Sequence, residues 1–377
     1  MDLAFDLPAA PRILVITMRR LGDVLLTTPL VRTLRRGFPD ARVDMLVFEG
    51  TEGILAGNSD IDRIITLPQR PTGAQTRALM RSLWRRYDLA VSTQSGDRPT
   101  FLAFAAGRHR VGLVPADRKG MWWKRRALHR TVPSDPQLHR VTELLRLADA
   151  LGIERCNEMV APQQAPQTVP RMPYAVLHAN PMYRIRRWTE QGWRALASAL
   201  RERGLSVVVT GGPDPAERQY LDSLWNPVTP PVERMDGRLN WPELSQLLSG
   251  ASVYVGPDTS MTHLAAAAGC PTVALYGPAS PHLTGPWPVG GLDDAWERSG
   301  TIQQRGNVWV LQNPLPCMPC DRLGCERHLA SYSRCLDELP LHQVMTAVDQ
   351  ALRFEKTSPP LQPALPADQS SRVVTRP

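Results

Sequence analysis

The sequence predicts an α/β protein of two domains, each with a mostly parallel sheet. Its 377 residues fit two domains of roughly 150 residues each. Short apolar, β-branched runs alternate with segments of helical periodicity, which is typical of βαβ units. Between the two alternating halves lies "CNEMVAPQQAPQTVPRMP", a Pro- and Gln-rich stretch without periodicity that indicates an interdomain linker.

The first half starts with "RILVIT", residues 12–17, which has the short apolar pattern of a buried strand. A helix is expected over "VLLTTPLVRTLRRGFP", ending at Gly37 and Pro39. The runs "RVDMLVF" and "IDRIITLP" predict two further strands. A helix over "RALMRSLWRRY", a strand over "DLAVST", and the segments "PTFLAFAAG" and "RHRVGL" continue the alternation.

The second half repeats this pattern. The run "YAVLHA" predicts a strand, and "TEQGWRALASALRERG" predicts a helix with Thr189 as its N-cap and Gly204 beyond its C-terminal end. Further strands are expected over "LSVVVTGG", "ASVYVG" and "CPTVALYG", and helices over "NWPELSQLLSG" and "SMTHLAAAAG". The segment "LPLHQVMTAVDQALRF" predicts a last amphipathic helix, and the composition from Lys356 onward predicts a disordered tail.

Composition restricts the class of protein. No apolar stretch approaches the roughly 18 residues needed to cross a bilayer, and the start "MDLAFDLPAAP" is acidic where a secretory signal is basic, so a cytoplasmic protein is expected. The formal charge of +8 favours anionic partners: nucleic acid, anionic lipid headgroups or phosphorylated small molecules. Neither G-x-G-x-x-G after the first strand nor G-x-x-x-x-G-K-[ST] occurs, which disfavours dinucleotide dehydrogenases and phosphate-loop hydrolases.

The strongest motif is "VYVGPDTSMTHLAAAAGCPTVALYGPASP", from Val253 to Pro281. A strand ends at Gly256, a short polar loop follows, and a helix of small residues begins. The unpaired N–H groups and positive dipole end of such a helix form a seat for phosphate. His263 falls one turn into this helix. A simpler interpretation is a capped helix with Asp258 or Ser260 as the cap.

A second motif, "HANPMYRIRRWTEQGW", places Arg184, Arg186 and Arg187 between a strand end and a helix start. Guanidinium groups there match the geometry of a diphosphate. The alternative is a solvated basic turn.

The third motif is "TMRRLGDVLLTTPLVRTLRR", which starts at Thr17. Asp23 stands where a helix N-cap belongs, and capping alone would explain a carboxylate there. The neighbouring Arg19 and Arg20 serve anionic ligands or lie in solvent. Asp97, in the loop "STQSGDRPT" after a later strand, is the competing carboxylate.

Two further clusters leave alternatives open. The stretch "RKGMWWKRRALHR" interleaves cations with Trp122 and Trp123, which fits nucleic acid, a membrane interface or an anionic sugar chain, or else an exposed loop whose tryptophans pack inward. Four cysteines follow C-x2-C-x4-C-x9-C spacing, which fits either a structural zinc site or reduced, uncoordinated thiols; they are Cys317, Cys320, Cys325 and Cys335.

Taken together, "MRRLGDVLLTTP", "HANPMYRIRRW", "VVVTGGP" and "GPDTSMTHLAAAAGCPTVALYGPASP" resemble the heptosyltransferases of lipopolysaccharide core assembly, glycosyltransferase family 9, and most of all the heptosyltransferase III type. The resemblance runs from about Arg12 to Phe354. It implies a GT-B fold, in which two Rossmann-like domains face each other across a cleft. The implied boundaries are an N-terminal acceptor-binding domain over 1–160, a linker over 161–173, a C-terminal nucleotide-sugar-binding domain over 174–340, a helix over 341–355 that crosses back to the first domain, and a tail over 356–377.

The resemblance also implies residue roles. Asp23 matches the family's G-D aspartate, which acts as the general base. Arg186 stands where the family usually has a lysine that contacts the donor diphosphate, and Asn180, Pro181 and Met182 replace the threonines that often precede it. The family's D-[ST]-x-x-x-H donor-binding run is matched by Asp258, Thr259, Ser260, Met261 and His263.

The implied activity is an inverting, metal-independent transfer from ADP-heptose, without a cofactor, to a lipid A-core oligosaccharide. The expected location is the cytoplasmic face of the inner membrane, held peripherally, with no nucleic-acid partner. Acceptor contacts are expected from Arg20, Asp97, Lys124 and Arg125. The alternatives are another GT-B transferase or an epimerase that uses a different nucleotide sugar, an inactive family member, or a basic nucleic-acid-binding module.

Overall fold

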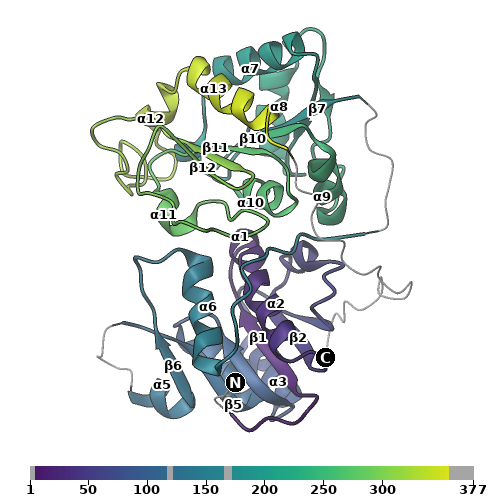
Figure 1. Cartoon of the computed structure of the whole chain (residues 1–377), viewed down its shortest axis with the longest axis vertical. Coiled ribbons are helices and arrows are strands. Elements are labelled where there is room, and N and C mark those ends of the chain that lie inside the picture. The colour runs from purple at the N-terminus through teal and green to yellow at the C-terminus, as the bar shows by residue number, and fades with distance from the viewer. Residues whose placement is uncertain (1–4, 117–121, 165–171, 356–377) are drawn as a thin grey trace. The chain divides into compact units, whose positions relative to one another are not determined.

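The computed structural model describes residues 5–116, 122–164 and 172–355 and divides into two compact units, with the boundary between Pro162 and Gln163. The boundary falls inside the linker expected over 161–173. Residues 165–171 of that linker and the expected tail from 356 lie outside the described residues. Each unit has its own sheet and its own core (Figure 1).

The first unit contains a six-stranded parallel sheet in the order β3-β2-β1-β4-β5-β6. Its four central strands are largely buried on both faces, as a parallel sheet covered by helices requires, whereas the two edge strands are partly exposed. The strand order reverses between β1 and β4, which is the position where ligands bind in open α/β sheets. The strands are β1 (Arg12–Thr17), β2 (Arg42–Phe48), β3 (Arg63–Leu67), β4 (Tyr87–Ser92), β5 (Gly107–Val114) and β6 (Arg130–Pro133).

Helices cover both faces of this sheet. Leu14 and Ile16 of β1 pack with α3 and α4 in one core cluster, while α2 and α6 lie side by side and contact β2, β5 and β6 (Figure 1). The helices are α1 (Leu21–Leu25), α2 (Thr28–Gly37), η1 (Glu52–Leu55, a 3-10 turn), α3 (Gly73–Leu83), α4 (Asp97–Ala106), α5 (Trp122–Ala127) and α6 (Arg140–Leu151).

The single helix expected over "VLLTTPLVRTLRRGFP" is in fact two, α1 and α2. Pro29 lies in the first turn of α2, where its missing N–H cannot donate to the Leu25 carbonyl one turn earlier. The Thr28 hydroxyl donates to that carbonyl instead, at 2.9 Å. The first helix therefore ends at Leu25, and the second helix begins at Thr28.

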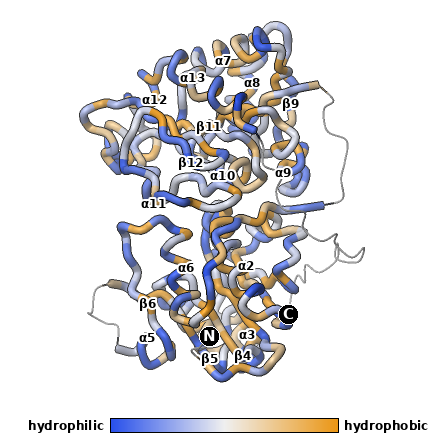
Figure 2. Tube along the Cα trace, viewed as in Figure 1, coloured by the Kyte–Doolittle hydropathy of each residue, from blue (hydrophilic) through white to orange (hydrophobic). Residues whose placement is uncertain are grey.

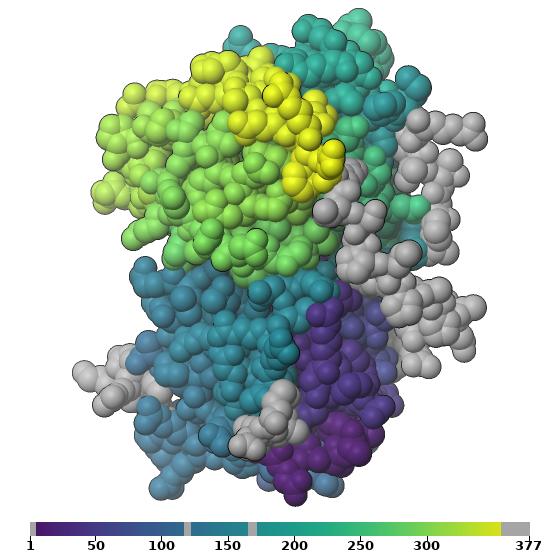
Figure 3. All heavy atoms as spheres, in the orientation of Figure 1, coloured from purple at the N-terminus to yellow at the C-terminus, as the bar shows by residue number. Residues whose placement is uncertain are grey.

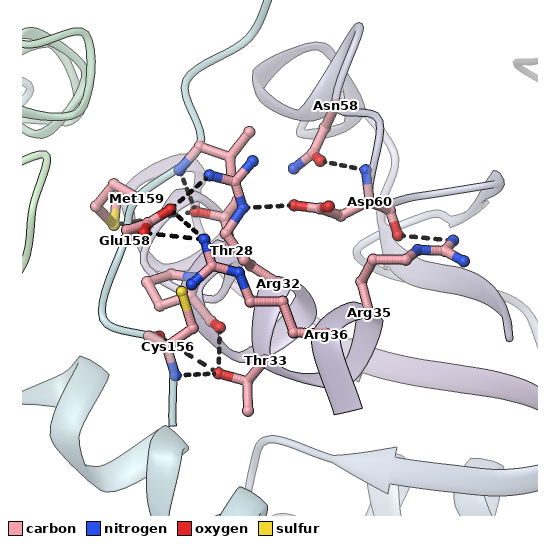
Figure 4. A network of polar contacts seen from close by, with 12 residues as sticks. Thr28, Arg32, Thr33, Arg35, Arg36, Asn58, Asp60, Cys156, Glu158 and Met159 are labelled. Atoms are coloured by element: carbon pink, nitrogen blue, oxygen red, sulfur yellow. Dashed lines mark hydrogen bonds and ion pairs between the residues drawn. The ribbon is translucent and has the colours of Figure 1, made fainter. Parts of the chain in front are cut away.

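The segment that follows α6 is fixed to α2 by a buried polar network (Figure 4). The Arg32 side chain is 10% exposed and donates to Asp60 at 2.8 Å and to Glu158 at 3.1 Å. The Cys156 N–H donates to the Thr33 hydroxyl at 2.9 Å. These contacts keep the chain up to the unit boundary attached to the first unit.

The second unit contains a seven-stranded sheet in the order β12-β13-β11-β10-β7-β8-β9. All neighbours are parallel except β12 and β13, which form an antiparallel pair at one edge. The order reverses between β7 and β10, as it does between β1 and β4 in the first sheet. The strands are β7 (Tyr174–His178), β8 (Ser206–Thr210), β9 (Glu233–Arg234), β10 (Val253–Pro257), β11 (Thr272–Leu275), β12 (Ile302–Arg305) and β13 (Val308–Leu311).

Two helix layers cover the second sheet. One core cluster joins the sheet to α7, α8 and α13, and another joins it to α10 on the opposite face. The apolar strands inside each unit stand out in the hydropathy view (Figure 2). The helices are η2 (Arg184–Arg186, a 3-10 turn), α7 (Glu190–Glu202), α8 (Pro215–Trp225), α9 (Trp241–Gly250), α10 (Ser260–Ala267), α11 (Pro281–Thr284), α12 (Arg334–Asp337) and α13 (Leu341–Leu352).

Local signals at the ends of α7 are confirmed. The Thr189 hydroxyl accepts from the Gly192 N–H at 3.0 Å, and Gly204 has a φ of +77° just past the helix.

The last helix differs from the expectation. The apolar stripe of α13 is buried against β10, β11 and β13, so this helix belongs to the second unit and not to the first (Figure 3).

Among the residues described, no helix combines the length and the apolar character that a membrane span needs.

Candidate functional site

In the first unit, Asp23 lies just beyond the carboxyl end of β1, at the point where the strand order reverses. It occupies the first turn of α1, whose N-cap is Arg20. The capping interpretation of Asp23 is therefore wrong. The carboxylate lies 3.7 Å from Arg19 and 4.0 Å from Arg140 instead, and its side chain is 23% exposed. It is both accessible and held near positive charge.

Arg140 is a site residue that the sequence did not indicate. Its side chain is 9% exposed, pairs with Glu143 at 2.7 Å and donates to the Thr93 carbonyl at 2.7 Å. Burial lowers the pKa of Arg140, yet arginine stays cationic at neutral pH. "HRVTELLRL" reads as the start of an ordinary amphipathic helix, so only the tertiary structure reveals its proximity to Asp23.

The loops after β1 and β4 are fixed to each other. The Gln94 amide accepts from the Met18 N–H and donates to the Met18 carbonyl, both at 2.9 Å. The Thr17 and Thr93 hydroxyls are hydrogen-bonded at 2.9 Å. Because Thr93 also binds Arg140, the same network that joins the two strand ends positions the cation next to Asp23.

The remaining first-unit candidates lie in two settings. Lys124 is buried and bonds the Ser95 carbonyl at 2.6 Å and the Asp97 carboxylate at 2.8 Å, so the structure brings these two candidates together. Asp97 is in the first turn of α4, directly after β4's loop. Arg20 and Arg125 are exposed.

In the second unit, the loop after β10 leads into α10. The N-cap of α10 is Thr259, without a side-chain capping bond, so the interpretation of Asp258 or Ser260 as the cap is wrong. Thr259 and Ser260 are partly exposed, whereas Met261 and His263 are buried within the helix. The start of α10 thus presents backbone N–H groups and two hydroxyls.

Asp258 is held by Arg186, which comes from η2 after β7. The guanidinium group lies 3.1 Å from the Asp258 carboxylate and donates to its backbone carbonyl at 2.8 Å. The Arg186 side chain is 36% exposed and the Asp258 side chain 6%. The carboxylate therefore orients a cation that still faces solvent, and β7 and β10 bring the two together at their carboxyl ends.

Arg187, the next arginine of that motif, packs on an aromatic ring. Arg187 stacks over the Tyr220 ring at 4.1 Å, as a packed cation rather than a free one.

A residue that the sequence did not indicate is Tyr276, at the end of β11. Its hydroxyl lies 3.4 Å from the Asp258 carboxylate and 2.9 Å from the Thr284 carbonyl, and burial raises its pKa well above the usual value. Tyr276 lies inside the motif from Val253 to Pro281, but its position in that motif did not indicate a contact with Asp258.

His178 ends β7 and hydrogen-bonds the Thr210 hydroxyl at 3.1 Å. Burial lowers the pKa of His178 from 6.5 to about 4. Between these two values the unfolded chain binds a proton that the folded chain does not, so stability falls as pH decreases from 6.5 to 4.

We expect His178→Gln to reduce this acid sensitivity. The wild type should lose about 3 kcal/mol more of its unfolding free energy than the variant between pH 7.5 and pH 4. Urea unfolding at the two pH values measures the difference. Equal losses in both proteins would contradict the assignment.

The four clustered cysteines are free, and Cys325 accepts a hydrogen bond from the Arg334 N–H at 3.4 Å. Over the described ranges, no group of three or more His, Cys, Asp or Glu side chains is placed to hold a metal ion.

Comparisons with known proteins agree on one family. A family model described as glycosyltransferase family 9 (heptosyltransferase) matches residues 76–290, more than half of the chain. Lipopolysaccharide heptosyltransferase 3 of Escherichia coli is 26% identical over 289 residues, covering 72% of this chain and 84% of the relative. Lipopolysaccharide heptosyltransferase 1 of Pseudomonas aeruginosa is 28% identical over 358 residues, covering 88% and 92%.

Solved structures show the same fold. The Escherichia coli heptosyltransferase WaaC with ADP has a TM-score of 0.68 at 21% identity, covering 90% of this chain and 99% of that one. WaaC with ADP-2-deoxy-2-fluoro heptose has a TM-score of 0.65 at 20% identity, covering 90% and 99%. A Veillonella parvula family 9 glycosyl transferase has a TM-score of 0.72 at 16% identity, covering 91% and 97%. The predicted α/β class with two mostly parallel, Rossmann-like sheets is confirmed.

Proposed function

Because the chain belongs to glycosyltransferase family 9, we propose that it is an inverting heptosyltransferase of lipopolysaccharide core assembly. The donor is ADP-heptose and the acceptor is an inner-core sugar on lipid A. The heptosyltransferase names of the relatives and the ADP-sugar held by one structural neighbour support this choice. The N-terminal domain binds the acceptor and the C-terminal domain binds the donor.

One observation carries the proposal. In each sheet, the candidate residues lie beyond the carboxyl ends of the two strands where the order reverses, β1 and β4 in the first and β7 and β10 in the second. Open α/β sheets bind ligands at that position. One unit offers a carboxylate there, and the other offers a cation and a helix N-terminus.

Asp23 is the general base. It takes the proton of the acceptor hydroxyl while the acceptor oxygen attacks the anomeric carbon of the heptose from the face opposite the diphosphate. The bond from that carbon to the diphosphate oxygen breaks, ADP departs with the electron pair, and the configuration inverts. Proton removal by a positioned side chain contributes about 10²–10⁴-fold in rate.

Arg186 and the start of α10 stabilise the leaving diphosphate. The solvent-facing guanidinium supplies two parallel donors to phosphate oxygens, and Asp258 fixes its orientation. Thr259 and Ser260 open the helix whose free N–H groups and dipole favour negative charge. With these donors and a diphosphate as leaving group, the reaction requires neither a metal nor a protein acid. Met261 and His263 complete the donor run by packing its helix.

The acceptor is polyanionic and borne by a membrane, so the enzyme works in the cytoplasm, held peripherally to the inner membrane. Arg20 and Arg125 are exposed cations suited to acceptor phosphates. Lys124 and Asp97 neutralise each other and shape the loop after β4, next to the strand end that leads to Asp23. Their role in acceptor binding is therefore to hold that loop in position.

Arg140 acts as a positioning residue for Asp23. We expect Arg140→Ala to lower kcat by about tenfold or more while the KM for ADP-heptose stays near wild type, since donor contacts lie in the other unit. Arg140→Lys should recover part of the loss because it restores the charge. Steady-state kinetics with separate titration of the donor tests this. Thermal unfolding of each variant measures how much stability is lost with the Arg140–Glu143 pair. A change confined to donor KM would contradict the role.

The experiment that tests the proposed function is mass spectrometry of lipopolysaccharide core from a strain that lacks this protein. A core truncated by one heptose is expected, and restoration by the wild-type gene but not by Asp23→Asn ties the loss to this site. An intact core would refute the function. A binding panel of ADP, UDP and GDP sugars separates it from the alternative of another nucleotide-sugar enzyme, which would prefer a different nucleotide.

A further inference from the structure

The positive charge of the chain is concentrated in one region. Residues 63–140 contain sixteen Lys and Arg but four Asp and Glu, although the whole chain has a net charge of +8. The rest of the chain is therefore net acidic. The basic region includes α3, α4 and α5, which form successive contacts, α3 with α4 and α4 with α5.

Exposed aromatic rings follow the same three helices. Trp84 is the C-cap of α3, Phe101 and Phe104 lie one turn apart on α4, and Trp122 begins α5. Their exposed fractions are 56%, 49%, 37% and 69% in that order. Trp123 stacks on Phe101 with ring centroids 4.7 Å apart. These are four of the five exposed Trp, Phe or Tyr side chains in the part of the chain that the structure describes.

Cations lie between the rings. The Arg85 guanidinium is 5.8 Å from the Trp84 ring and 5.8 Å from the Phe104 ring, so it joins α3 to α4. The Arg126 guanidinium is 5.8 Å from the Trp122 ring. Several exposed arginines of these helices and their ends form no ion pair with the described residues. They are Arg77, Arg81, Arg85, Arg86, Arg98, Arg125 and Arg126.

The outer face of α3 is also hollowed. An open depression of about 430 Å³ is lined by Arg77, Met80, Arg81 and Trp84. Its lining is almost wholly apolar, and two of its four lining residues are arginines. This combination suits a lipid, whose headgroup phosphate pairs with arginine while its upper acyl chain contacts apolar surface.

We propose that this α3–α4–α5 face, defined by its exposed rings and arginines, docks on an anionic phospholipid bilayer. Tryptophan and phenylalanine insert at the level of the headgroups, and unpaired arginines bind the negative surface. A single-stranded nucleic acid fits less well, because Phe101 and Trp123 stack on each other and leave fewer ring faces for bases. The partner is the lipid surface itself.

The placement has a consequence for the proposed function, on which this part rests. Helix α4 starts with Asp97, which is bound to Lys124 of α5, and it follows the loop after β4 that is joined to the Asp23 loop. Docking through α4 and α5 therefore brings the lipid surface to the helices nearest the acceptor side.

Vesicle co-sedimentation of the full chain tests the proposal. Binding is expected on phosphatidylcholine vesicles that contain about 30% phosphatidylglycerol, with a loss of about tenfold or more in affinity on pure phosphatidylcholine or in about 0.5 M salt. Arg77→Glu/Arg81→Glu should weaken binding about tenfold or more, and Trp84→Ala/Trp122→Ala should weaken it at unchanged salt dependence. The matched control Arg322→Glu/Arg327→Glu, two exposed arginines of the second unit, should bind like wild type.

Equal binding to neutral vesicles, equal losses in the control, or tight binding to single-stranded nucleic acid or to a second copy through the same residues would overturn the proposal. Transfer to a deacylated, soluble acceptor separates this outcome from failure of the proposed function. The docking variants should keep that transfer. If docking fails while transfer persists, only the docking face is wrong; if vesicles bind as expected and no form transfers heptose, only the function is wrong.

Discussion

Asp23→Asn is expected to lower turnover by about 10²–10⁴-fold, because the amide cannot take the proton of the acceptor hydroxyl. The change is nearly isosteric, and the carboxylate is 23% exposed with cations at 3.7 and 4.0 Å, so the fold should tolerate it. The pair with the exposed Arg19 is worth little in stability, and the buried Arg140 keeps its partner Glu143 at 2.7 Å. ADP-heptose affinity should stay within about twofold of wild type, since the donor residues belong to the other unit.

Asp97→Asn is the matched control. Asp97 also lies in the first turn of a helix that follows a strand at the point where the strand order reverses, and it also pairs with a cation, Lys124. If position and charge alone mattered, both variants would lose activity alike. We expect the loss of kcat only in Asp23→Asn, whereas Asp97→Asn should at most raise the KM for the acceptor, because Asp97 holds the loop after β4. The measurement is kcat under saturating acceptor, with calorimetric donor binding alongside. Turnover near wild type in Asp23→Asn would remove the general base from the account.

Arg186→Ala is expected to lower kcat/KM by about 10²–10³-fold, the scale for removing one strong donor to developing charge. The loss should appear in donor affinity as well as in kcat, because the diphosphate is charged before and after transfer. Arg186→Lys should recover a part of it, since lysine keeps the charge but not the paired donors. Kinetics and ADP binding measured for both variants give the two contributions.

Two controls separate chemistry from packing in that experiment. Removing Arg186 leaves Asp258, 6% exposed, without its cation, so some loss of thermal stability is expected. Arg186→Ala/Asp258→Asn should regain stability but not activity. Arg187→Ala, which removes a cation stacked on Tyr220, should change donor affinity little. A loss in Arg187→Ala as large as that in Arg186→Ala would mean that general positive charge, and not a specific clamp, binds the donor.

Much of the fold was predictable because periodicity and turn chemistry are local. Strands β1 to β5 of the first sheet, the Thr189 cap and Gly204 all follow from short stretches, whereas β6 was not predicted. The motif resemblance to family 9 heptosyltransferases is confirmed by the family match and the relatives. The antiparallel pair β12–β13 was not predicted, since "IQQR" lacks a strand's apolar character and forms a strand only beside β13.

The sequence indicated Asp23, Arg186 and Asp258 as candidates, but it indicated neither their contacts nor Arg140 and Tyr276. Asp23 and Asp258 each stood beside a helix start, where sequence alone makes a cap the ordinary interpretation, and only the structure shows Arg20 and Thr259 in those positions. Arg140 is 117 residues from Asp23 along the chain, too far for any local pattern to connect them. The α13 helix was assigned by resemblance to the first domain, whereas its own apolar stripe is buried in the second.

The central claim is that a carboxylate from one unit and a cation with a helix start from the other serve a single displacement on ADP-heptose. The most direct measurement is NMR of the product formed from ADP-heptose and a deacylated inner-core acceptor, with ADP release followed in parallel. The account predicts one ADP per new glycosidic bond, with the anomeric configuration inverted. Retention of configuration, or ADP release without a new linkage, would contradict it.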